Sequence, residues 1–439
     1  DLIIPDKVSY NDKEYNVISI DGEAFMNCRN LTSIQLPSSI NTIYDSAFRG
    51  CSGLTSVTMP GVEQIDHYAF DGCTSLTSVS MPAVKDLSGY NFRGCSKLAS
   101  VSMPVVESIG SYVFEECASF AIELPKSLNS LSSFAFVGNR FTSFTIDEGN
   151  EHYTSVDGVL YDKNITKLIA FPALKGGTFT IPSTVTNILS NAFPCGTTLE
   201  ELIIPATVNS FADGAFECSP HIKKLTIEDS GNPLTFGKGN SSCSVYNDDT
   251  GNYLGISTIF YETVEAYIGR NIRYSNDDIS LFAGSSSLNK VGLGINVTSM
   301  PKYTFSNCHM IDHVNYKGTI SDWCNISFAN ADATPMGKSM TDSYSGSAVL
   351  YCNDSPLHSQ VNISEGVTKI ESYCFYGMYG VSSVIIPSSV KTIEPYAFSN
   401  GFITEVWINS EDVISIADEI YKTFGITYRA EYSTRPEDF

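Results

Sequence analysis

The residues best suited to metal chemistry lie in Cys308–His313, which reads Cys-His-Met-Ile-Asp-His. A thiol, two imidazoles and a carboxylate are groups that zinc and related metals bind. His309 and His313 are four residues apart, the spacing that brings two side chains to one face of a helix. Ile311, however, begins a strand pattern between them. We therefore expect ordinary structural residues here and no metal site.

Two acidic segments, Asp147–Glu151 and Asn247–Asp249, have the oxygen ligands that calcium prefers. Neither follows the order of an EF-hand loop, and exposed acidic loops are common in soluble proteins. The chain has no Gly-x-Ser-x-Gly and no Walker motif, and Gly292-Leu293-Gly294 lacks the third glycine of a dinucleotide-binding loop. The sequence therefore indicates no catalytic residues, metal or cofactor, and we predict that the protein is not an enzyme.

The charge of the chain argues against two classes of partner. Its 439 residues include 48 acidic and 26 basic side chains, for a formal charge of −22. Such a field repels nucleic-acid phosphates and anionic lipid. No stretch reaches the 18 apolar residues of a membrane span. The chain starts at Asp1, so we expect a mature or trimmed product whose export signals have been removed.

The elements that must position any functional side chain are repeats. Cysteines recur every 22 or 23 residues, each three residues after a phenylalanine. A fixed period of this length is typical of a solenoid, in which each turn contacts only its neighbours. The paired columns are Phe25/Cys28, Phe48/Cys51, Phe70/Cys73, Phe92/Cys95 and Phe114/Cys117.

Each turn has two halves. The first reads L-T-S-V-T-M-P at 54–60, so Val57 and Met59 point to one side of a short strand that Pro60 ends. The second half places an aliphatic residue five positions before the phenylalanine, as in Ile43/Phe48. We predict a solenoid, mainly β and right-handed, with 22–23-residue turns, a parallel sheet along one face and little helix.

The twelve cysteines could form disulfides or remain as thiols. Equivalent cysteines in successive turns would lie roughly 5 Å apart with their side chains pointing the same way. That direction does not favour a disulfide, whereas a buried thiol is a small apolar group with a weak donor. We therefore favour a column of free thiols that face loop carbonyls. Cys374 replaces the small alanine of its column and is expected to be unreactive.

The repeat frame also indicates the organisation of the chain. Asp157-Gly158 lies between alternating residues that suit a hairpin, and 228–263 is rich in Gly, Ser, Asn and Asp. Ser410 could cap a terminal helix that ends near Gly425. We predict a cap and first turn at 1–30, a regular array at 31–227 with a hairpin at 147–177, an irregular segment at 228–263, a divergent array at 264–409 with an insertion at 316–349, and a helix and cap at 410–439.

The pattern C-x-x-L-x-x-V-x-L/M-P, followed by I-x-x-x-A-F-x-G-C, resembles the repeat of the BspA-like leucine-rich repeat proteins. It covers about 31–225, 264–315 and 360–410. The resemblance implies a secreted or surface-displayed bacterial protein. It also implies binding to extracellular proteins or glycans, including host matrix proteins such as fibronectin or fibrinogen. It brings no catalytic residues.

The outward strand positions are the candidate binding surface, because Ser and Thr hydroxyls there offer hydrogen bonds without charge. Trp323, in the expected insertion, is either a binding anchor or a residue that packs the insertion onto the core. The alternative to a binding protein is a structural spacer, and a hydrolase built on 228–349 is a third hypothesis. The candidate residues are Thr55, Ser56, Thr58, Ser78, Ser80, Ser102 and Trp323.

Overall fold

The computed structural model describes residues 2–216, 221–239, 241–247, 252–336, 348–378, 380–399 and 403–408. These residues form a parallel β-solenoid, as predicted. Within them helix is confined to α1 (Ile320–Trp323) and the 3₁₀ turn η1 (Ala331–Ala333). The chain divides into two compact units. One contains Asp1–Gly177, Thr184–Leu199 and Phe211–Cys218, and the other contains the remainder.

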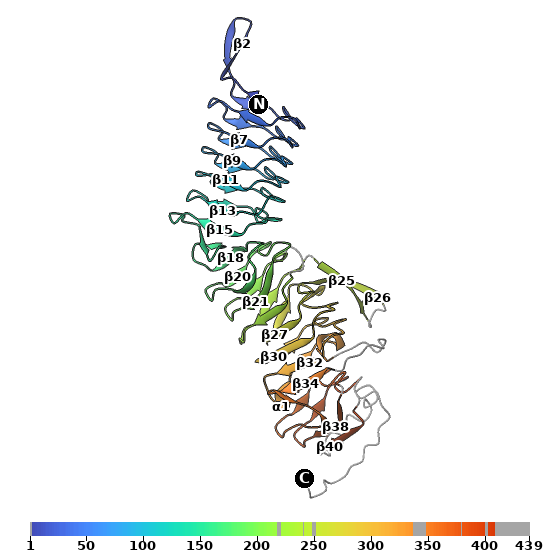
Figure 1. The fold of residues 1–439 in the computed structure, drawn as a ribbon. Coiled ribbons are helices and arrows are strands. Elements are labelled where there is room, and N and C mark those ends of the chain that lie inside the picture. Colours follow the sequence, from blue (N-terminus) through green and yellow to red (C-terminus); the bar gives the residue numbers. More distant parts are fainter. Residues whose placement is uncertain are drawn as a thin grey trace. The chain divides into compact units, whose positions relative to one another are not determined.

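A parallel sheet of short strands runs through the first unit. Its strands lie in chain order, so each turn adds one strand beside the strand of the turn before (Figure 1). Val57 pairs with Ile34 and with Val79, which keeps the inward residues of successive turns in register. The strands are β1 (Leu2–Ile3), β5 (Ser33–Gln35), β7 (Ser56–Thr58), β9 (Ser78–Ser80) and β11 (Ser100–Ser102).

The second half of each turn builds another parallel sheet in the same unit. Each of its strands is only two residues long, because the chain turns again directly after the inward aliphatic residue. The strands are β4 (Ser19–Ile20), β6 (Thr42–Ile43), β8 (Gln64–Ile65), β10 (Asp86–Leu87), β12 (Ser108–Ile109) and β14 (Ser130–Leu131).

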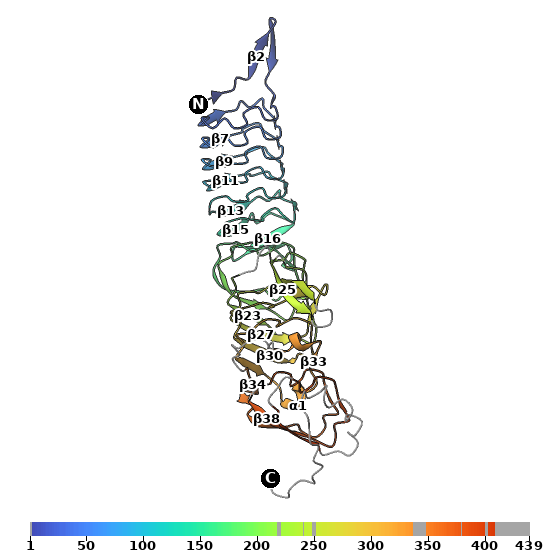
Figure 2. The same ribbon diagram turned by 90° about the vertical axis from the view of Figure 1, so that its right-hand side faces the viewer.

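The remaining strands of the first unit lie at its ends. A hairpin of β2 (Lys7–Tyr10) and β3 (Lys13–Asn16) projects from the first turn (Figure 2). Asp157-Gly158 joins two antiparallel strands within the range given for the hairpin. The strands toward the C-terminal end of the unit are β13 (Ala121–Leu124), β15 (Ser143–Ile146), β16 (Tyr153–Val156), β17 (Val159–Asp162), β18 (Lys167–Ala170), β20 (Asn187–Ile188) and β22 (Ser210–Phe211).

The second unit also consists mainly of parallel strands. Its largest sheet has the order β19 (Gly177–Thr180), β21 (Leu199–Ile204), β23 (Lys224–Ile227), β27 (Glu265–Arg270), β30 (Lys290–Asn296), β32 (His313–Tyr316), β34 (Val349–Cys352) and β35 (Ser355–Pro356). The other strands are β24 (Leu234–Phe236), β25 (Ser241–Asn247), β26 (Asn252–Thr258), β28 (Ile272–Tyr274), β29 (Ile279–Ser280), β31 (Ser299–Met300), β33 (Ser327–Phe328), β36 (Ser359–Asn362), β37 (Lys369–Ile370), β38 (Val381–Ile386), β39 (Thr392–Ile393) and β40 (Glu405–Ile408).

The core of the first unit is a column of stacked phenylalanine rings. The ring centroids of Phe48 and Phe70 are 5.2 Å apart, and those of Phe70 and Phe92 are 5.5 Å apart. The planes differ by 6° and 9°, and all three side chains are fully buried. Aromatic pairs of this kind are worth about 0.5–1.5 kcal/mol beyond their buried area. The predicted register of the phenylalanine column is confirmed.

The loops between the strands are also bonded from turn to turn. The N–H of Phe48 donates to the carbonyl of Ala69 at 2.8 Å, and the N–H of Gly50 donates to the carbonyl of Asp71 at 2.7 Å. One turn later, Phe70 donates to the carbonyl of Asn91 at 3.0 Å. Buried backbone groups must find partners, and here the next turn supplies them. The solenoid therefore has a hydrogen-bond ladder along its loops as well as along its strands.

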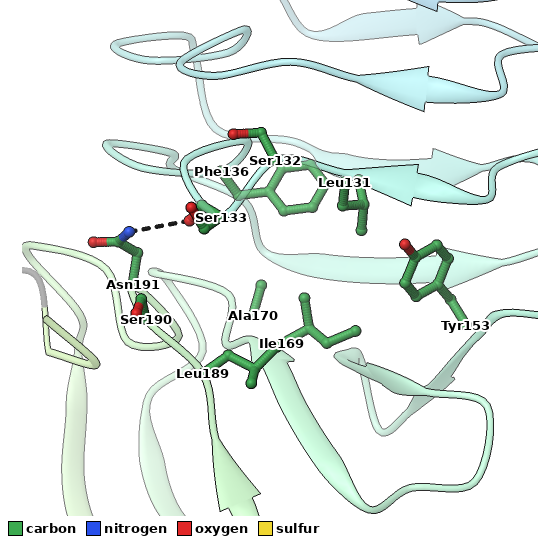
Figure 3. A pocket seen from close by; sticks show the side chains of 10 residues that line it. All are labelled: Leu131, Ser132, Ser133, Phe136, Tyr153, Ile169, Ala170, Leu189, Ser190 and Asn191. Carbon is green, nitrogen blue, oxygen red and sulfur yellow. Dashed lines mark hydrogen bonds between the residues drawn. The ribbon is translucent and has the colours of Figure 1, made fainter. Parts of the chain in front are cut away.

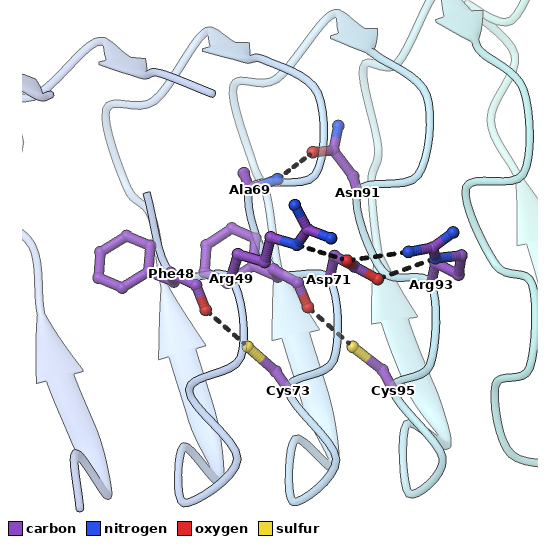
Figure 4. Close-up of polar contacts among 9 residues, drawn as sticks. Phe48, Arg49, Ala69, Asp71, Cys73, Asn91, Arg93 and Cys95 are labelled. Carbon is purple, nitrogen blue, oxygen red and sulfur yellow. Dashed lines mark hydrogen bonds and ion pairs between the residues drawn. The ribbon is translucent and has the colours of Figure 1, made fainter. Parts of the chain in front are cut away.

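The cysteine column consists of free thiols that donate to backbone carbonyls of the preceding turn. Cys73 donates to Phe48 at 3.2 Å and Cys95 to Phe70 at 3.3 Å (Figure 4). Burial raises the pKa of Cys51 to about 11 and that of Cys117 to about 12, since a thiolate loses its hydration there. The predicted thiol column is confirmed. Cys195, outside the column, is disulfide-bonded.

A charged contact links three successive turns. The carboxylate of Asp71, which is 9% exposed, lies between Arg49 Nε at 3.0 Å and Arg93 Nε at 2.9 Å (Figure 4). Both guanidinium groups also lie over the Tyr68 ring, at 5.3 and 5.7 Å from its centroid. The hydrogen bond to Asp71 raises the pKa of Arg93. This cluster fixes neighbouring turns at the edge of the stacked core.

Two segments are more regular than the sequence suggested. Within 228–263, β25 and β26 form an antiparallel ribbon, because 241–247 alternates in a way that the Gly- and Ser-rich composition obscured. Within 316–349, β33 pairs with β31 in parallel and Phe328 is 2% exposed, so the described part joins the core. The predicted helix in 410–439 lies outside the described residues.

The phenylalanine column gives a direct stability prediction. Phe70→Ala removes a buried ring with neighbours on both faces, and we expect the free energy of unfolding to fall by about 3–5 kcal/mol. Urea unfolding followed by circular dichroism measures the change. The exposed Thr58→Ala in the same unit is the matched control, with an expected change within about 0.5 kcal/mol. A loss below about 1 kcal/mol for Phe70→Ala would contradict the stacked core.

The thiol column predicts a dependence on pH. A thiol whose pKa is higher in the folded chain stabilises the fold below the unfolded value of 9.0 and loses that contribution as the pH rises toward 11 or 12. We expect the free energy of unfolding to fall less steeply above pH 9 in Cys51→Ala/Cys117→Ala than in the unchanged chain. Cys28→Ala, which removes an exposed thiol, is the control. Equal slopes in all three proteins would refute the prediction.

Candidate functional site

The outward face of β7, β9 and β11 carries two rows of hydroxyl groups. In these strands the central valine points into the core, and the residues on either side of it point outward. Strand register then aligns the hydroxyls of successive turns. One row is Ser56, Ser78 and Ser100, and the other is Thr58, Ser80 and Ser102. We call these six residues the hydroxyl face.

The structure brings the strand residues of the predicted site together. Ser56, Thr58, Ser78 and Ser102 are exposed and Ser80 is half-buried, all on this one face. Thr55, just before β7, is exposed too, but its hydroxyl donates to the carbonyl of Thr32 at 3.0 Å. Thr55 therefore connects two turns at the border of the hydroxyl face.

The hydroxyl face is uncharged. The outward residues of the preceding strand, β5, are Ser33 and Gln35, so four successive strands present only neutral polar groups. In a chain of charge −22, this concentrates the carboxylates elsewhere. A ligand on this face would meet hydrogen-bond donors and acceptors without strong attraction or repulsion of its own charge.

The face ends at a depression of about 530 Å³ between β11 and β13. Glu123 and Asp147 contribute carboxylates to its lining beside Ser102. The sheet order is broken here, and the sequence shows why. Pro125 follows Cys117 by eight residues, whereas Pro104 follows Cys95 by nine. A one-residue shift disturbs strand register. That shorter interval was the signal that could have revealed the break.

Trp323 does not belong to this surface. Its ring is fully buried, and its Nε1–H donates to the carbonyl of Cys374 at 2.8 Å. The ring lies 5.5 Å from that of Tyr316 and 5.5 Å from that of Phe328. Of the two alternatives for Trp323, the structure supports packing onto the core and not the binding anchor, because α1 turns the indole inward. Trp323 packs its segment against neighbouring turns.

The metal candidates have structural contacts. The Cys308 thiol donates to the carbonyl of Phe282 at 3.1 Å, and the His313 ring lies 4.2 Å from that of Tyr351. Asn150 of the acidic loop is buried and donates to the carbonyl of Leu128 at 2.8 Å. In the part of the chain that the structure describes, no three His, Cys, Asp or Glu side chains are grouped as metal ligands. Asp248 and Asp249 lie outside it.

A column of tyrosines flanks the phenylalanine column. Tyr68, Tyr90 and Tyr112 are half-buried, and their ring centroids are 4.7 and 5.0 Å apart. Their φ angles of 57°, 63° and 58° are left-handed, a conformation that costs a residue with Cβ about 1–2 kcal/mol. Stacking offsets part of that cost. Because the rings cover one another, this column is internal packing rather than an open aromatic platform.

The comparisons with known proteins agree with this architecture. A family model described as the BspA type leucine rich repeat region matches residues 8–105, 85–175, 164–235, 257–334 and 349–428. No curated protein matches the chain. No helix among the described residues is long and apolar enough to cross a membrane.

Solved structures of bacterial proteins are similar to this chain. A leucine rich cell surface protein from Faecalibacterium prausnitzii is 26% identical, with a TM-score of 0.50 over 74% of this chain and 90% of that one. The pneumococcal vaccine antigen PcpA is 18% identical, with a TM-score of 0.53 over 93% and 89%. A leucine-rich repeat protein from Bacteroides ovatus is 22% identical, with a TM-score of 0.50 over 91% and 84%.

The family model spans well over half of the sequence, and the Phe, Cys and strand columns of the structure are the repeat that it describes. The chain therefore belongs to the BspA-type leucine-rich repeat family.

Proposed function

We propose that this chain is a non-catalytic protein of the cell surface or extracellular space whose hydroxyl face binds proteins or glycans. The observation that carries the proposal is the two aligned rows of outward hydroxyls on β7, β9 and β11. Their alignment produces a repeated donor and acceptor pattern with the spacing of parallel strands, about 4.8 Å. An extended ligand could form the same contact at each turn.

The exposure of these residues supports a role outside the fold. Val57 and Val79, which alternate with them, are each 3% exposed and hold the strands to the core. Outward Ser and Thr side chains contribute little to that packing, so they can serve a ligand at little cost to stability. Many weak contacts along an array add up when the ligand is itself extended or repeated.

The comparisons support the location and the binding role. Solenoids present long surfaces, and leucine-rich repeat folds are generally non-catalytic binding structures. One similar protein is described as a cell surface protein and another as a vaccine antigen. We extend the surface location to this chain by that likeness. Its proposed partners are extracellular proteins or glycans, including the matrix proteins fibronectin and fibrinogen.

Binding of the purified chain to immobilised fibronectin, fibrinogen and a panel of glycans tests the proposal. Thr58→Lys/Ser80→Lys places two long cations on the hydroxyl face, and we expect it to weaken binding at least tenfold, or about 1.4 kcal/mol. The matched control is Ser19→Lys/Thr42→Lys, which makes the same charge change on β4 and β6. The control should bind as the unchanged chain does.

Two outcomes would count against the binding proposal. If no probe is retained above background, the spacer alternative gains support. If both double variants bind as tightly as the unchanged chain, the ligand contacts a surface other than the hydroxyl face.

A further inference from the structure

A small apolar hollow opens in the first unit, and none of the residues that line it belongs to the hydroxyl face. It measures about 180 Å³ and is lined by apolar side chains from β14, β18 and the segment after β20, with Tyr153 at one side (Figure 3). Ser132, Ser133, Ser190 and Asn191 form its polar rim. Asn191 Nδ2 donates to the carbonyl of Ser133 at 3.0 Å, which joins two loops beside the opening (Figure 3).

The hollow exists because the second sheet is interrupted. The parallel order ends at β14, and the hairpin of β16 and β17 enters before β18 resumes the pattern. Leu131 at the end of β14 is consequently half-buried, whereas Leu87 and Ile109 in the same column are 2% exposed. The interruption leaves part of the core column open to a ligand.

The sequence changes polarity at the same place. The residue after the inward aliphatic is Ser88, Gly110 and Ser132 in successive turns of the regular array. In the next two turns it is Ile169 and Leu189, both half-buried and both lining the hollow. Two aliphatic residues therefore stand beside the opening at a position that holds Ser or Gly in those three preceding turns, which favours a binding role over chance exposure.

The size of the hollow decides what it can hold. Pockets for whole small ligands usually measure about 300 Å³ or more. A hollow of about 180 Å³ suits one apolar side chain of a larger partner. No charged residue lines it, so the buried part of the ligand must be uncharged. A single buried side chain in a rimmed pocket is the usual anchor of a protein interface.

An open groove of about 620 Å³ leads to the hollow and shares Leu131 and Ser132 with it. It crosses β10, β12 and β14, and Asp86 and His67 contribute to its lining. The turns that border it, 63–67, 85–90, 107–112 and 129–133, carry four carboxylates and one lysine. This local excess of negative charge favours a basic partner.

We propose that the groove and the hollow together bind an extended segment of a partner protein, which inserts one apolar side chain between Leu131, Ile169 and Leu189 and places basic residues along the groove. The site is separate from the hydroxyl face and does not depend on the function proposed for that face. An anionic membrane is a poor occupant because its charge matches that of the groove.

The test uses the full chain and capped heptapeptides of lysine and glycine, labelled for fluorescence anisotropy. The peptide with a central phenylalanine should bind at least tenfold more tightly than the peptide with a central glycine, because only the first has an anchor. Glutamate in place of lysine should abolish binding, and added salt should weaken it. Equal binding of the phenylalanine and glycine peptides, or tighter binding of the glutamate peptide, would overturn the proposal.

Variants locate the site. Leu189→Gln should weaken binding of the phenylalanine peptide at least tenfold. Val105→Gln, an uncharged exchange at an exposed apolar residue outside the site, should leave that binding unchanged. Thermal unfolding verifies that both variants fold. An unchanged affinity in a folded Leu189→Gln chain would refute the site. The proposal is also refuted if N-acetylglucosamine oligomers bind the unchanged chain, displace the peptide and fail to bind Leu189→Gln, since the occupant would then be a glycan.

Discussion

The structure depends on one constraint: each turn must satisfy its backbone and its inward side chains on the next turn. A turn of 22 or 23 residues is too short to bury a core alone. Its strand amides, loop amides and thiols therefore bond to neighbouring turns, as Phe48 does to Ala69 and Cys73 does to Phe48. Where the chain keeps its period of 22 or 23 residues, the hydrogen bonds of the strands, the loops and the thiols all align between successive turns.

This constraint explains which features the sequence could predict. The Phe and Cys columns were predictable because each column repeats one residue type, and only stacking satisfies that repetition. For Trp323 the sequence left two alternatives open, because a single indole gives no column and its burial depends on the partner carbonyl of Cys374, 51 residues away. The openings beside β11 and β14 were predictable only as interruptions of the repeat, and their shapes were not. They arise from a missing residue before Pro125 and from an inserted hairpin, and the spatial effect of each depends on its neighbours.

The same constraint separates structural from functional positions. Inward residues are fixed by their equivalents in adjacent turns, so they cannot vary to suit a ligand. Outward residues such as Thr58 and Ser80 are not constrained in this way. The interruption beside Leu131 exposes groups that the regular turns cover. In this protein the candidate binding surfaces lie at those two kinds of position, and the tyrosine column, although partly exposed, is occupied by its own stacking.

Hydrogen exchange of the loop amides tests the central claim most directly. The N–H groups of Phe48, Gly50, Phe70 and Gly72 lie in loops but donate to carbonyls of the next turn. They should exchange as slowly as the strand amide of Val57, since opening any of them requires neighbouring turns to separate. If these loop amides exchange as fast as those of the exposed β2–β3 hairpin, the turns are not joined along their loops and the account of the solenoid is wrong.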